Sequence, residues 1–352
     1  MRVLMLGGSH DNPGGVEAFC ERSTEALHRR GQWKAERIPT ESAYLRFATV
    51  GKFLGGLRSL TRYRCQPPDC VWLSYVNLPD LTFLVVARLL RMRVLVTPHL
   101  GSNWRSQKSP ALRALSRVLL RLAHSLALIS RTQELEIALP AAVPKSDIRN
   151  FLSESLLQSP LARINEVPEL RLIHSGRLSE GKGTFMLIDV CALLKGWGVP
   201  FSATVTGGAD ADTFTRLAAL IAKHGLEDHV RVVGRIPEAQ LLDEMRRSDV
   251  LVHLSKIDSY PLIVIEALAC STFPLCMELA GARDMIQQYA GQLVSQEGAV
   301  ESAANFLATA DLADLRRRAA DAAVRVREDY SWDNCVAALE AALHSTVGSN
   351  RS

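Results

Sequence analysis

The sequence contains no apolar run as long as a membrane-spanning helix needs, so no segment is a candidate transmembrane helix. Its seven cysteines are scattered without a C-x-x-C pair, which argues against a zinc site or a disulfide framework and indicates reduced thiols. No G-x-G-x-x-G loop is present, so the fingerprint of the dinucleotide-binding enzymes is missing. Low-complexity segments and short repeats are absent too. The class that remains is a globular protein with a cytoplasmic location.

Charge is unevenly distributed along the chain. Residues 1–150 contain 22 Lys and Arg against 11 Asp and Glu, residues 151–352 contain 19 against 26, and the formal net charge is +4. A length of 352 residues, with 47% hydrophobic and 22% charged residues, is ordinary for two globular domains. A basic half and an acidic half indicate that these domains have different partners.

Short apolar runs alternate with helical periodicity, which is typical of βα units and parallel sheets. In the first half, strands are expected near 2–7, 33–38, 70–74, 93–98 and 125–129, and helices near 16–30, 43–63, 79–91 and 110–123. A second series of strands is expected at 170–174, 201–206, 230–233, 250–253 and 273–276, before terminal helices at 311–327 and 331–346.

The stretch 158–168 contains two prolines and shows weak periodicity, so it is the predicted linker. The predicted domains are therefore 1–157 and 169–328, followed by a terminal helical segment, 329–352. The fold class is α/β, with two Rossmann-like domains facing each other across a cleft. Ligands of such folds bind at the carboxyl ends of the strands.

Two carboxylates, Asp258 and Glu266, stand eight positions apart around a proline-containing turn and an apolar run. Pro261 suits the first position of a helix, which places Asp258 in the preceding loop and Glu266 inside the helix. Free N–H groups at the helix start, beside Tyr260 and Leu262, would then face an anion or a sugar hydroxyl. The alternative is a capping loop and a buried helix that carry acids by chance.

Arg177 and Lys182 share one glycine-flanked loop between a strand and a helix. Two cations that converge on such a loop can neutralise a leaving diphosphate without a metal. A solvated loop with two surface cations is the alternative interpretation.

Two further loops contain paired glycines. Gly14 and Gly15 precede the first helix, where the backbone could approach a phosphate closely, although a lone Gly-Gly turn is weak evidence. Gly207 follows the strand 201–206. Asp210-Ala-Asp212 comes next and spells a metal-binding triplet, but its place before a helix favours an N-cap, so no metal site is predicted.

These motifs resemble the retaining GT-B glycosyltransferases of the family 4 type, the glycosyl transferases group 1. That family usually has Glu, seven residues, Glu, where this chain has Asp258 and Glu266. Its Gly-Arg-x-x-x-x-Lys-Gly pattern matches residues 176–183, and its Gly-Gly-x-Glu loop matches 14–17. The resemblance covers nearly the whole chain, strongly over 170–287 and more loosely over 1–150.

The resemblance implies a GT-B fold whose last helix crosses back to the first domain. It also implies that Arg177, Lys182 and the amides of Gly14 and Gly15 hold the donor diphosphate, and that Gly207 lets the nucleotide pack against the backbone.

Glu266 would hold the ribose and Asp258 the sugar hydroxyls, with Tyr260, Pro261 and Leu262 in the same site. His99, which ends a strand, would lie near the acceptor and the sugar carbon, although a lone histidine on a loop is as often structural.

The function implied is metal-independent transfer of a sugar, such as a hexose, from a nucleotide-diphosphate sugar to a glycan or lipid-linked acceptor, in bacterial surface polysaccharide or glycolipid assembly. No cofactor beyond the donor substrate and no nucleic acid is implied. A GT-B nucleotide-sugar epimerase and a non-catalytic binding protein stay open, the latter because Asp258 replaces Glu. A dinucleotide-dependent oxidoreductase needs the glycine fingerprint that is missing.

The segment from Tyr44 to Arg58 mixes apolar and cationic residues as an interfacial helix does. It predicts a peripheral contact between the basic first domain and an anionic membrane surface, on the inner face of the cell membrane. The alternative is a solvated helix face whose arginine stems cover the core.

Overall fold

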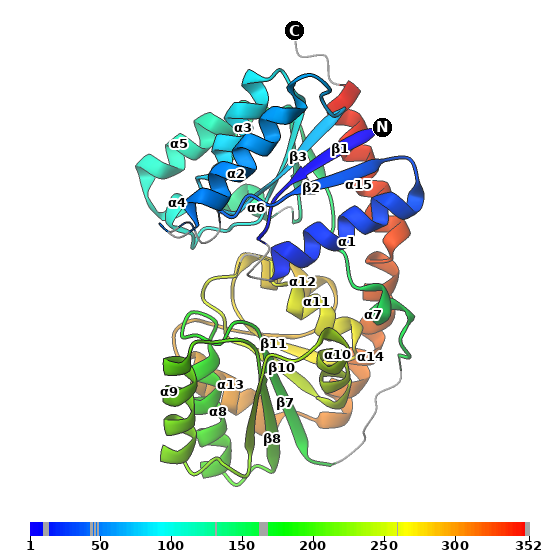
Figure 1. The fold of residues 1–352 in the computed structure, drawn as a ribbon. Helices are drawn as coiled ribbons and strands as arrows, with labels where there is room; N and C mark the ends of the chain where they lie inside the picture. Colours follow the sequence, from blue (N-terminus) through cyan, green and yellow to red (C-terminus); the bar gives the residue numbers. More distant parts are fainter. Residues whose placement is uncertain are drawn as a thin grey trace. The chain divides into compact units, whose positions relative to one another are not determined.

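The computed structural model describes residues 1–9, 14–42, 45, 47, 49–130, 132–161, 168–258 and 260–348. The chain forms two compact units: unit 1 is Met1–Leu152 with Tyr330–Ser352, and unit 2 is Ser153–Asp329. Each unit contains one parallel sheet of six strands with helices packed on both faces (Figure 1). The prediction of two Rossmann-like α/β domains is confirmed.

Unit 1 is built on a sheet with the strand order β2-β1-β3-β4-β5-β6. Its strands are β1 (Arg2–Leu6), β2 (Lys34–Ile38), β3 (Cys70–Tyr75), β4 (Val94–Pro98), β5 (Ser125–Leu128) and β6 (Lys145–Asp147). Its helices are α1 (Gly15–Arg30), α2 (Val50–Thr61), the 3-10 turn η1 (Arg62–Arg64), α3 (Asp80–Leu89), α4 (Arg105–Lys108), α5 (Pro110–Leu120), α6 (Gln133–Glu136) and α15 (Trp332–Gly348).

The central strands of unit 1 are covered on both faces. Every residue of β3 is buried, which is typical of a parallel strand between two helical layers. Helices α2, α3 and α5 pack along one face, and α1 and α15 cover the other (Figure 1). The apolar face of α3 supplies Leu81, Phe83 and Leu84 to this core.

The terminal helix α15 is part of unit 1 and is anchored at its first turn. The indole Nε1 of Trp332 donates to the carbonyl oxygen of Leu152 at 2.7 Å. The guanidinium of Arg29, on α1, lies 4.7 Å from the centre of the same indole ring. The helix then packs along β3, β4, β5 and β6.

Unit 2 is built on a sheet with the strand order β12-β11-β10-β7-β8-β9. Its strands are β7 (Leu170–Ser175), β8 (Phe201–Thr206), β9 (Val230–Gly234), β10 (Val250–His253), β11 (Phe273–Met277) and β12 (Gln292–Val294). Its helices are α7 (Glu154–Gln158), α8 (Thr184–Gly196), α9 (Ala211–Lys223), α10 (Glu238–Arg247), α11 (Leu262–Ala269), α12 (Ala280–Gln288), α13 (Ala299–Thr309) and α14 (Leu312–Asp329).

A buried ion pair ties the amino-terminal ends of two strands of unit 2 to α14. Asp249 is fully buried, and its Oδ1 accepts from Arg316 Nε at 2.8 Å. Its Oδ2 accepts the backbone N–H of Arg171 at 2.8 Å. This carboxylate therefore fixes the starts of β7 and β10 at the end of the sheet opposite their carboxyl ends.

The predicted helix 43–63 is wrong at its start, because α2 begins at Val50. Residues 43, 44, 46 and 48 lie outside the described residues, and Leu45 and Phe47 are not helical. The reason lies in the preceding turn, where the hydroxyl of Ser42 donates to the buried carboxylate of Asp80 on α3. That bond fixes the chain after β2 to the start of α3, and α2 begins eight residues later, at Val50, with Thr49 as its N-cap.

The strands β6 and β12 were not predicted, because each has only three residues. No helix in the described parts of the chain combines the length and the apolar character that crossing a bilayer requires.

Candidate active site

The sheet of unit 2 has its topological switch point between β7 and β10. From β7 the chain moves outward on one side to β8 and β9, and then returns to pair β10 with the other side of β7. Ligands of open α/β sheets bind outside the carboxyl ends of the strands at such a point. Lys182 follows β7 and Asp258 follows β10, so both predicted residues belong to this place.

Lys182 and Asp258 form an ion pair, and a histidine completes it. The Lys182 ammonium donates to Oδ1 of Asp258. His253, the last residue of β10, donates from Nε2 to Oδ2 of Asp258 at 2.9 Å. The His253 side chain is 5% exposed, that of Asp258 16% and that of Lys182 25%, so the lysine is the partner closest to solvent.

The pKa of Asp258 lies well below its usual range. Burial disfavours the charged carboxylate, but the hydrogen bond and charge of His253 and the Lys182 ammonium together outweigh that burial. Asp258 is therefore a carboxylate at every pH near neutrality, able to accept hydrogen bonds but unable to donate a proton.

A second buried histidine, His174, stabilises the loop that carries Lys182. Its Nδ1 donates to the carbonyl oxygen of Val252 at 3.0 Å, and its Nε2 accepts from the Thr184 hydroxyl at 3.0 Å. The same hydroxyl accepts the backbone N–H of Ser179 at 3.0 Å. Burial lowers the pKa of His174 to about 4, so the imidazole is neutral near pH 7, as this bonding pattern requires.

The loops after β7 and β10 touch through their backbones. The Lys256 N–H donates to the carbonyl oxygen of Gly181 at 2.9 Å. Gly183 has φ +77°, and a Cβ at this position would lie 2.3 Å from the carbonyl oxygen of Leu254. Only glycine fits there, and this contact keeps Lys182 beside Asp258.

The acidic pair brackets the start of α11, as the sequence predicted. Pro261 is the N-cap and Leu262 the first helical residue, so the predicted first position of Pro261 is one residue off. Tyr260 lies half-buried before the cap, and Glu266 is the fifth residue of the helix and is buried, with 9% of the residue exposed. The two carboxylates thus lie on either side of the helix N-terminus, whose first N–H groups lack intrahelical acceptors.

Gly207, after β8, is required by the packing of the backbone. Its φ is +147°, and a Cβ there would lie 1.6 Å from the carbonyl oxygen of Gly176. Its N–H donates to Gly234 O at 2.8 Å. The neighbouring Arg177 is exposed at the carboxyl end of β7, so the structure brings Arg177, Lys182 and Gly207 to adjacent strand ends.

Asp210, three residues further along, is the N-cap of α9. Its Oδ1 accepts the backbone N–H of Thr213 at 2.8 Å. The prediction that this aspartate caps a helix is confirmed.

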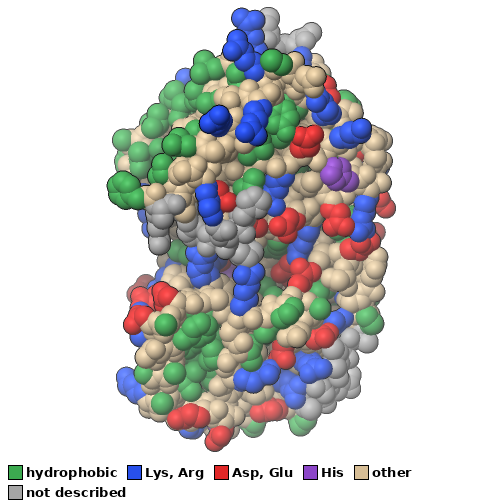
Figure 2. All heavy atoms as spheres, viewed as in Figure 1, with side chains coloured by type: hydrophobic (Ala, Val, Ile, Leu, Met, Phe, Trp, Pro, Cys, Tyr) green, Lys and Arg blue, Asp and Glu red, His purple; other side chains and the backbone are tan. Residues whose placement is uncertain are grey.

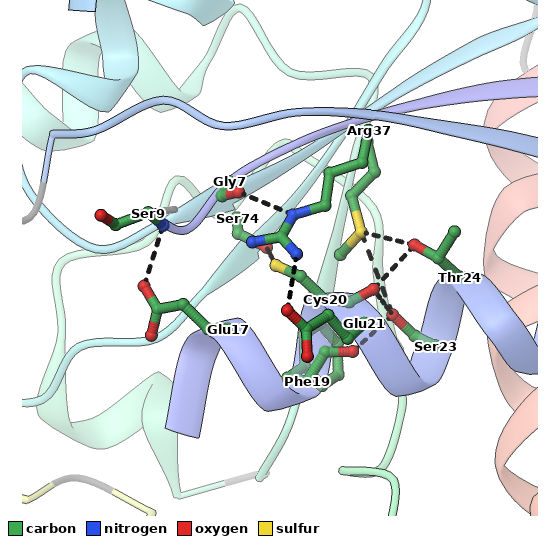
Figure 3. A network of polar contacts seen from close by, with 11 residues as sticks. Gly7, Ser9, Glu17, Phe19, Cys20, Glu21, Ser23, Thr24, Arg37 and Ser74 are labelled. Atoms are coloured by element: carbon green, nitrogen blue, oxygen red, sulfur yellow. Dashed lines mark hydrogen bonds and ion pairs between the residues drawn. The ribbon is translucent and has the colours of Figure 1, made fainter. Parts of the chain in front are cut away.

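Unit 1 has its own switch point between β1 and β3, where a glycine loop meets the first turns of α1 (Figure 3). The N–H of Ser9 donates to Oε1 of Glu17 at 3.0 Å. Arg37 reaches across from β2 and donates from Nε to the Gly7 carbonyl oxygen at 3.3 Å (Figure 3). Burial raises the pKa of Glu17, although its backbone hydrogen bonds and Arg37 act in the opposite direction.

Gly14 and Gly15 stand at the start of α1. Gly14 is its N-cap with an extended backbone, and a Cβ at Gly15 would meet no atom within 4 Å. Gly15 is therefore not demanded by the fold, whereas a Cβ at Gly14 would lie 3.1 Å from Oε2 of Glu17, so that side chain would have to shift. Their predicted contact with a phosphate stays a prediction.

His99 follows β4, and its backbone N–H donates to the carbonyl oxygen of Tyr75 at 2.8 Å. Its ring packs edge-on against Phe19, with the ring centres 4.8 Å apart. The Nε2 atom is buried and has no hydrogen-bond partner among the described residues. Burial lowers the pKa of His99 to about 3, so this imidazole is neutral near pH 7 and carries no charge for the chemistry.

Three polar residues near the carboxyl ends of strands in the two sheets were not predicted as site residues. His253 and His174 were counted as parts of apolar strands. Asp80 is completely buried, and its Oδ2 accepts the N–H groups of Val76 and Asn77 at 2.8 and 2.9 Å. An aspartate in the first turn of an expected helix was the signal that could have identified it.

A cavity of about 310 Å³ in unit 2 lies away from these residues. It is lined by the early residues of β7, β8 and β9 together with α10, among them Arg171, Ser202, Arg231 and Glu244. Because none of the predicted site residues lines it, this cavity is not the candidate active site.

Comparison with known proteins finds a family match that covers most of unit 2. Residues 163–324 match the family model "Glycosyl transferases group 1", and this region contains both Lys182 and the acidic pair. The amylovoran biosynthesis glycosyltransferase AmsK of Erwinia amylovora is 27% identical over 144 residues, which are 39% of this chain and 35% of AmsK. The D-inositol 3-phosphate glycosyltransferase of Streptomyces coelicolor is 30% identical over 151 residues, 42% of this chain and 33% of that protein.

The chain thus spans about a third of the length of these curated relatives. Among solved structures, HepE of Anabaena in complex with UDP and glucose superposes with a TM-score of 0.77 at 18% identity, over 98% of this chain and all of HepE. That likeness shows the two-domain GT-B fold. Residues 163–324 thus resemble the glycosyl transferases group 1, and both curated relatives are similar to part of this chain.

Proposed function

We propose that the chain is a retaining glycosyltransferase that moves a sugar from a nucleotide-diphosphate sugar to a glycan or lipid-linked acceptor in bacterial surface polysaccharide or glycolipid assembly. One observation carries the proposal: a lysine and a carboxylate meet at the switch point of unit 2, inside the region that matches the family model. Each is a group that a diphosphate or a sugar hydroxyl can bind.

In this proposal Lys182 and Arg177 bind the donor diphosphate and stabilise the charge that it gains as it leaves. Two cations can take the place of a divalent metal in that role, so the transfer is metal-independent. Asp258 accepts hydrogen bonds from sugar hydroxyls, and Glu266 accepts them from the ribose. Retention is proposed to follow same-face attack assisted by the leaving phosphate, as the family resemblance implies, so the proposal includes no protein nucleophile.

A ligand-shift screen tests the function. The intact protein is mixed with UDP-, GDP- and ADP-sugars, and with the plain diphosphates, with and without EDTA. One family of nucleotides is expected to raise the melting temperature through binding to the folded state. The complex of HepE with UDP and glucose favours the uridine series.

EDTA is expected to leave both binding and transfer unchanged. No shift with any nucleotide, or formation of an epimerised nucleotide sugar without acceptor, would contradict the proposal. Full loss of activity on chelation would instead favour a metal site at Asp210 and Asp212.

Contact with an anionic membrane surface is part of the proposal. Hydrophobic side chains gather on the side of unit 1 formed by α2, α3 and α5 (Figure 2). Phe47 is fully exposed, Leu54 on α2 is 55% exposed and Val118 on α5 is 54% exposed. Lys52 and Arg117 belong to the same two helices. Tyr44 and Arg46, part of the predicted interfacial segment, lie outside the described residues.

Liposome flotation measures this contact. Binding to anionic vesicles is expected at low salt and should weaken at high salt, because each cation near the surface contributes about 1 kcal/mol that salt screens. Leu54→Ser should weaken binding, whereas Val324→Ser, an equally exposed position on α14 of unit 2, should not. If the protein does not bind anionic vesicles even at low salt, the membrane contact is contradicted, and the exposed faces of α2 and α5 are simply solvated.

A further inference from the structure

The two oxygens of Asp258 have partners of different mobility. Oδ2 accepts from His253, whose ring is part of a buried strand and whose side chain is 5% exposed. Oδ1 accepts from Lys182, whose side chain is 25% exposed and carries its ammonium on a flexible four-carbon stem. One contact is therefore rigid, and the other can be exchanged for a ligand.

Within the described part of the chain, the His253 imidazole is hydrogen-bonded only through Nε2. Its Nδ1 is buried without a hydrogen-bond partner among the described residues. A carboxylate can only accept, so Nε2 carries the hydrogen and the ring donates to Asp258. The bond between His174 and Val252 O fixes the residue before His253, which holds the imidazole in place from behind.

We propose that His253 is a positioning residue that holds Asp258 in one orientation while Oδ1 changes its partner from Lys182 to a sugar hydroxyl of the donor. This inference rests on the proposed function. As the diphosphate attracts the ammonium of Lys182, Oδ1 loses its hydrogen-bond donor, and a hydroxyl of the sugar takes that position. Oδ2 keeps its bond to His253, so the carboxylate does not rotate when the lysine leaves.

The ion pair between Lys182 and Asp258 is thus the resting arrangement of the free site. It keeps both charges satisfied at a partly buried place, where an unpaired carboxylate is costly. A plain nucleoside diphosphate binds the Lys182 ammonium and so breaks the ion pair, but it offers no new donor to Asp258. A nucleotide sugar binds the Lys182 ammonium in the same way, and its sugar hydroxyl also donates to Asp258. The affinity for the nucleotide sugar therefore depends on the orientation of Asp258, whereas the affinity for the plain diphosphate does not.

The test compares UDP with UDP-glucose, or the GDP or ADP pair if the screen selects it. His253→Leu removes the donor at similar volume. It is expected to weaken UDP-glucose binding about tenfold, the usual effect of losing one hydrogen bond to a charged group, and to change UDP binding less than twofold. His253→Gln can place an N–H near the position of Nε2, and it should restore UDP-glucose affinity to within about threefold of the parent.

His253→Asn is the second variant, because it keeps a polar side chain but is too short to place its N–H where Nε2 stands. It should behave like His253→Leu even if the leucine variant folds poorly. His229→Leu is the matched control at the amino-terminal end of β9, where the imidazole stacks on Phe201, and it should change neither affinity.

The outcomes separate this inference from the proposed function. If the parent protein binds neither UDP, GDP nor ADP species, the proposed function fails. If the parent binds them but His253→Leu and His253→Asn keep the parental ratio of the two affinities, the positioning role is overturned. Equal weakening in the glutamine and leucine variants would overturn it as well, because it would show that the ring is needed for packing alone.

Discussion

Lys182→Ala is expected to lower turnover by about two orders of magnitude or more, a loss of roughly 2–4 kcal/mol of transition-state stabilisation. A charge-assisted contact to the diphosphate strengthens as that group gains charge, so the loss should appear in kcat more than in KM. The fold should survive, because the side chain is 25% exposed and its removal opens no core cavity. Initial-rate kinetics and a melting curve measure the two effects.

The matched control is Lys223→Ala. Lys223 is an exposed lysine at the end of α9, on the same unit but away from the strand ends that carry the site. It should keep parental turnover. Activity of Lys182→Ala within a few-fold of the parent would reject the diphosphate assignment, and Lys182→Arg should lie between the two, because it keeps the charge but changes its geometry.

The architecture could be predicted well from the sequence because parallel strands that are buried on both faces appear in it as continuous apolar runs. β3 and β10 are two such runs, buried at every position. Short or polar elements were predicted poorly, since β6 has only three residues, of which Lys145 and Asp147 are charged. Such strands form through pairing with a neighbour, and the neighbour is known only after the sheet order is known.

Part of the candidate site could be predicted for a related reason. Lys182 stands in a glycine-flanked loop, and Asp258 precedes a helix start, so the local pattern alone made each of them a candidate. Their meeting could not be derived locally, since 76 positions separate them and only the pairing of β7 with β10 brings their loops together.

His253 was missed because a histidine that ends an apolar strand looks like a residue of the core. Its role depends on Asp258, five positions later, turning back to the strand end. The sequence feature that would have marked His253 as a site residue is a titratable side chain at the last position of a strand beside the switch point. This feature can be recognised only when the strand order is known.

Asp258→Ala is expected to reduce transfer strongly without weakening the binding of a plain nucleoside diphosphate. A hydrogen bond from a buried hydroxyl to a carboxylate contributes about 1.5–3 kcal/mol, so kcat/KM with the nucleotide sugar should fall by about 10- to 150-fold. Removing the carboxylate also releases the Lys182 ammonium from its ion pair, so UDP should bind as well as before or more tightly. Kinetics with the sugar nucleotide and calorimetry with UDP separate the two effects.

Glu266→Gln is expected to give the reverse pattern, with weaker nucleotide binding, because the ribose is assigned to that side of the α11 start. Asp212→Asn, an exposed carboxylate on α9, is the control that should change nothing. Asp258→Glu is the most informative exchange. His253 and Lys182 already contact the shorter acid, so an added methylene displaces the carboxylate from both partners and should cost most of the transfer. If Asp258→Ala transfers sugar at the parental rate, the residue is only a loop acid, and Lys182 needs another partner to explain its position at the switch point.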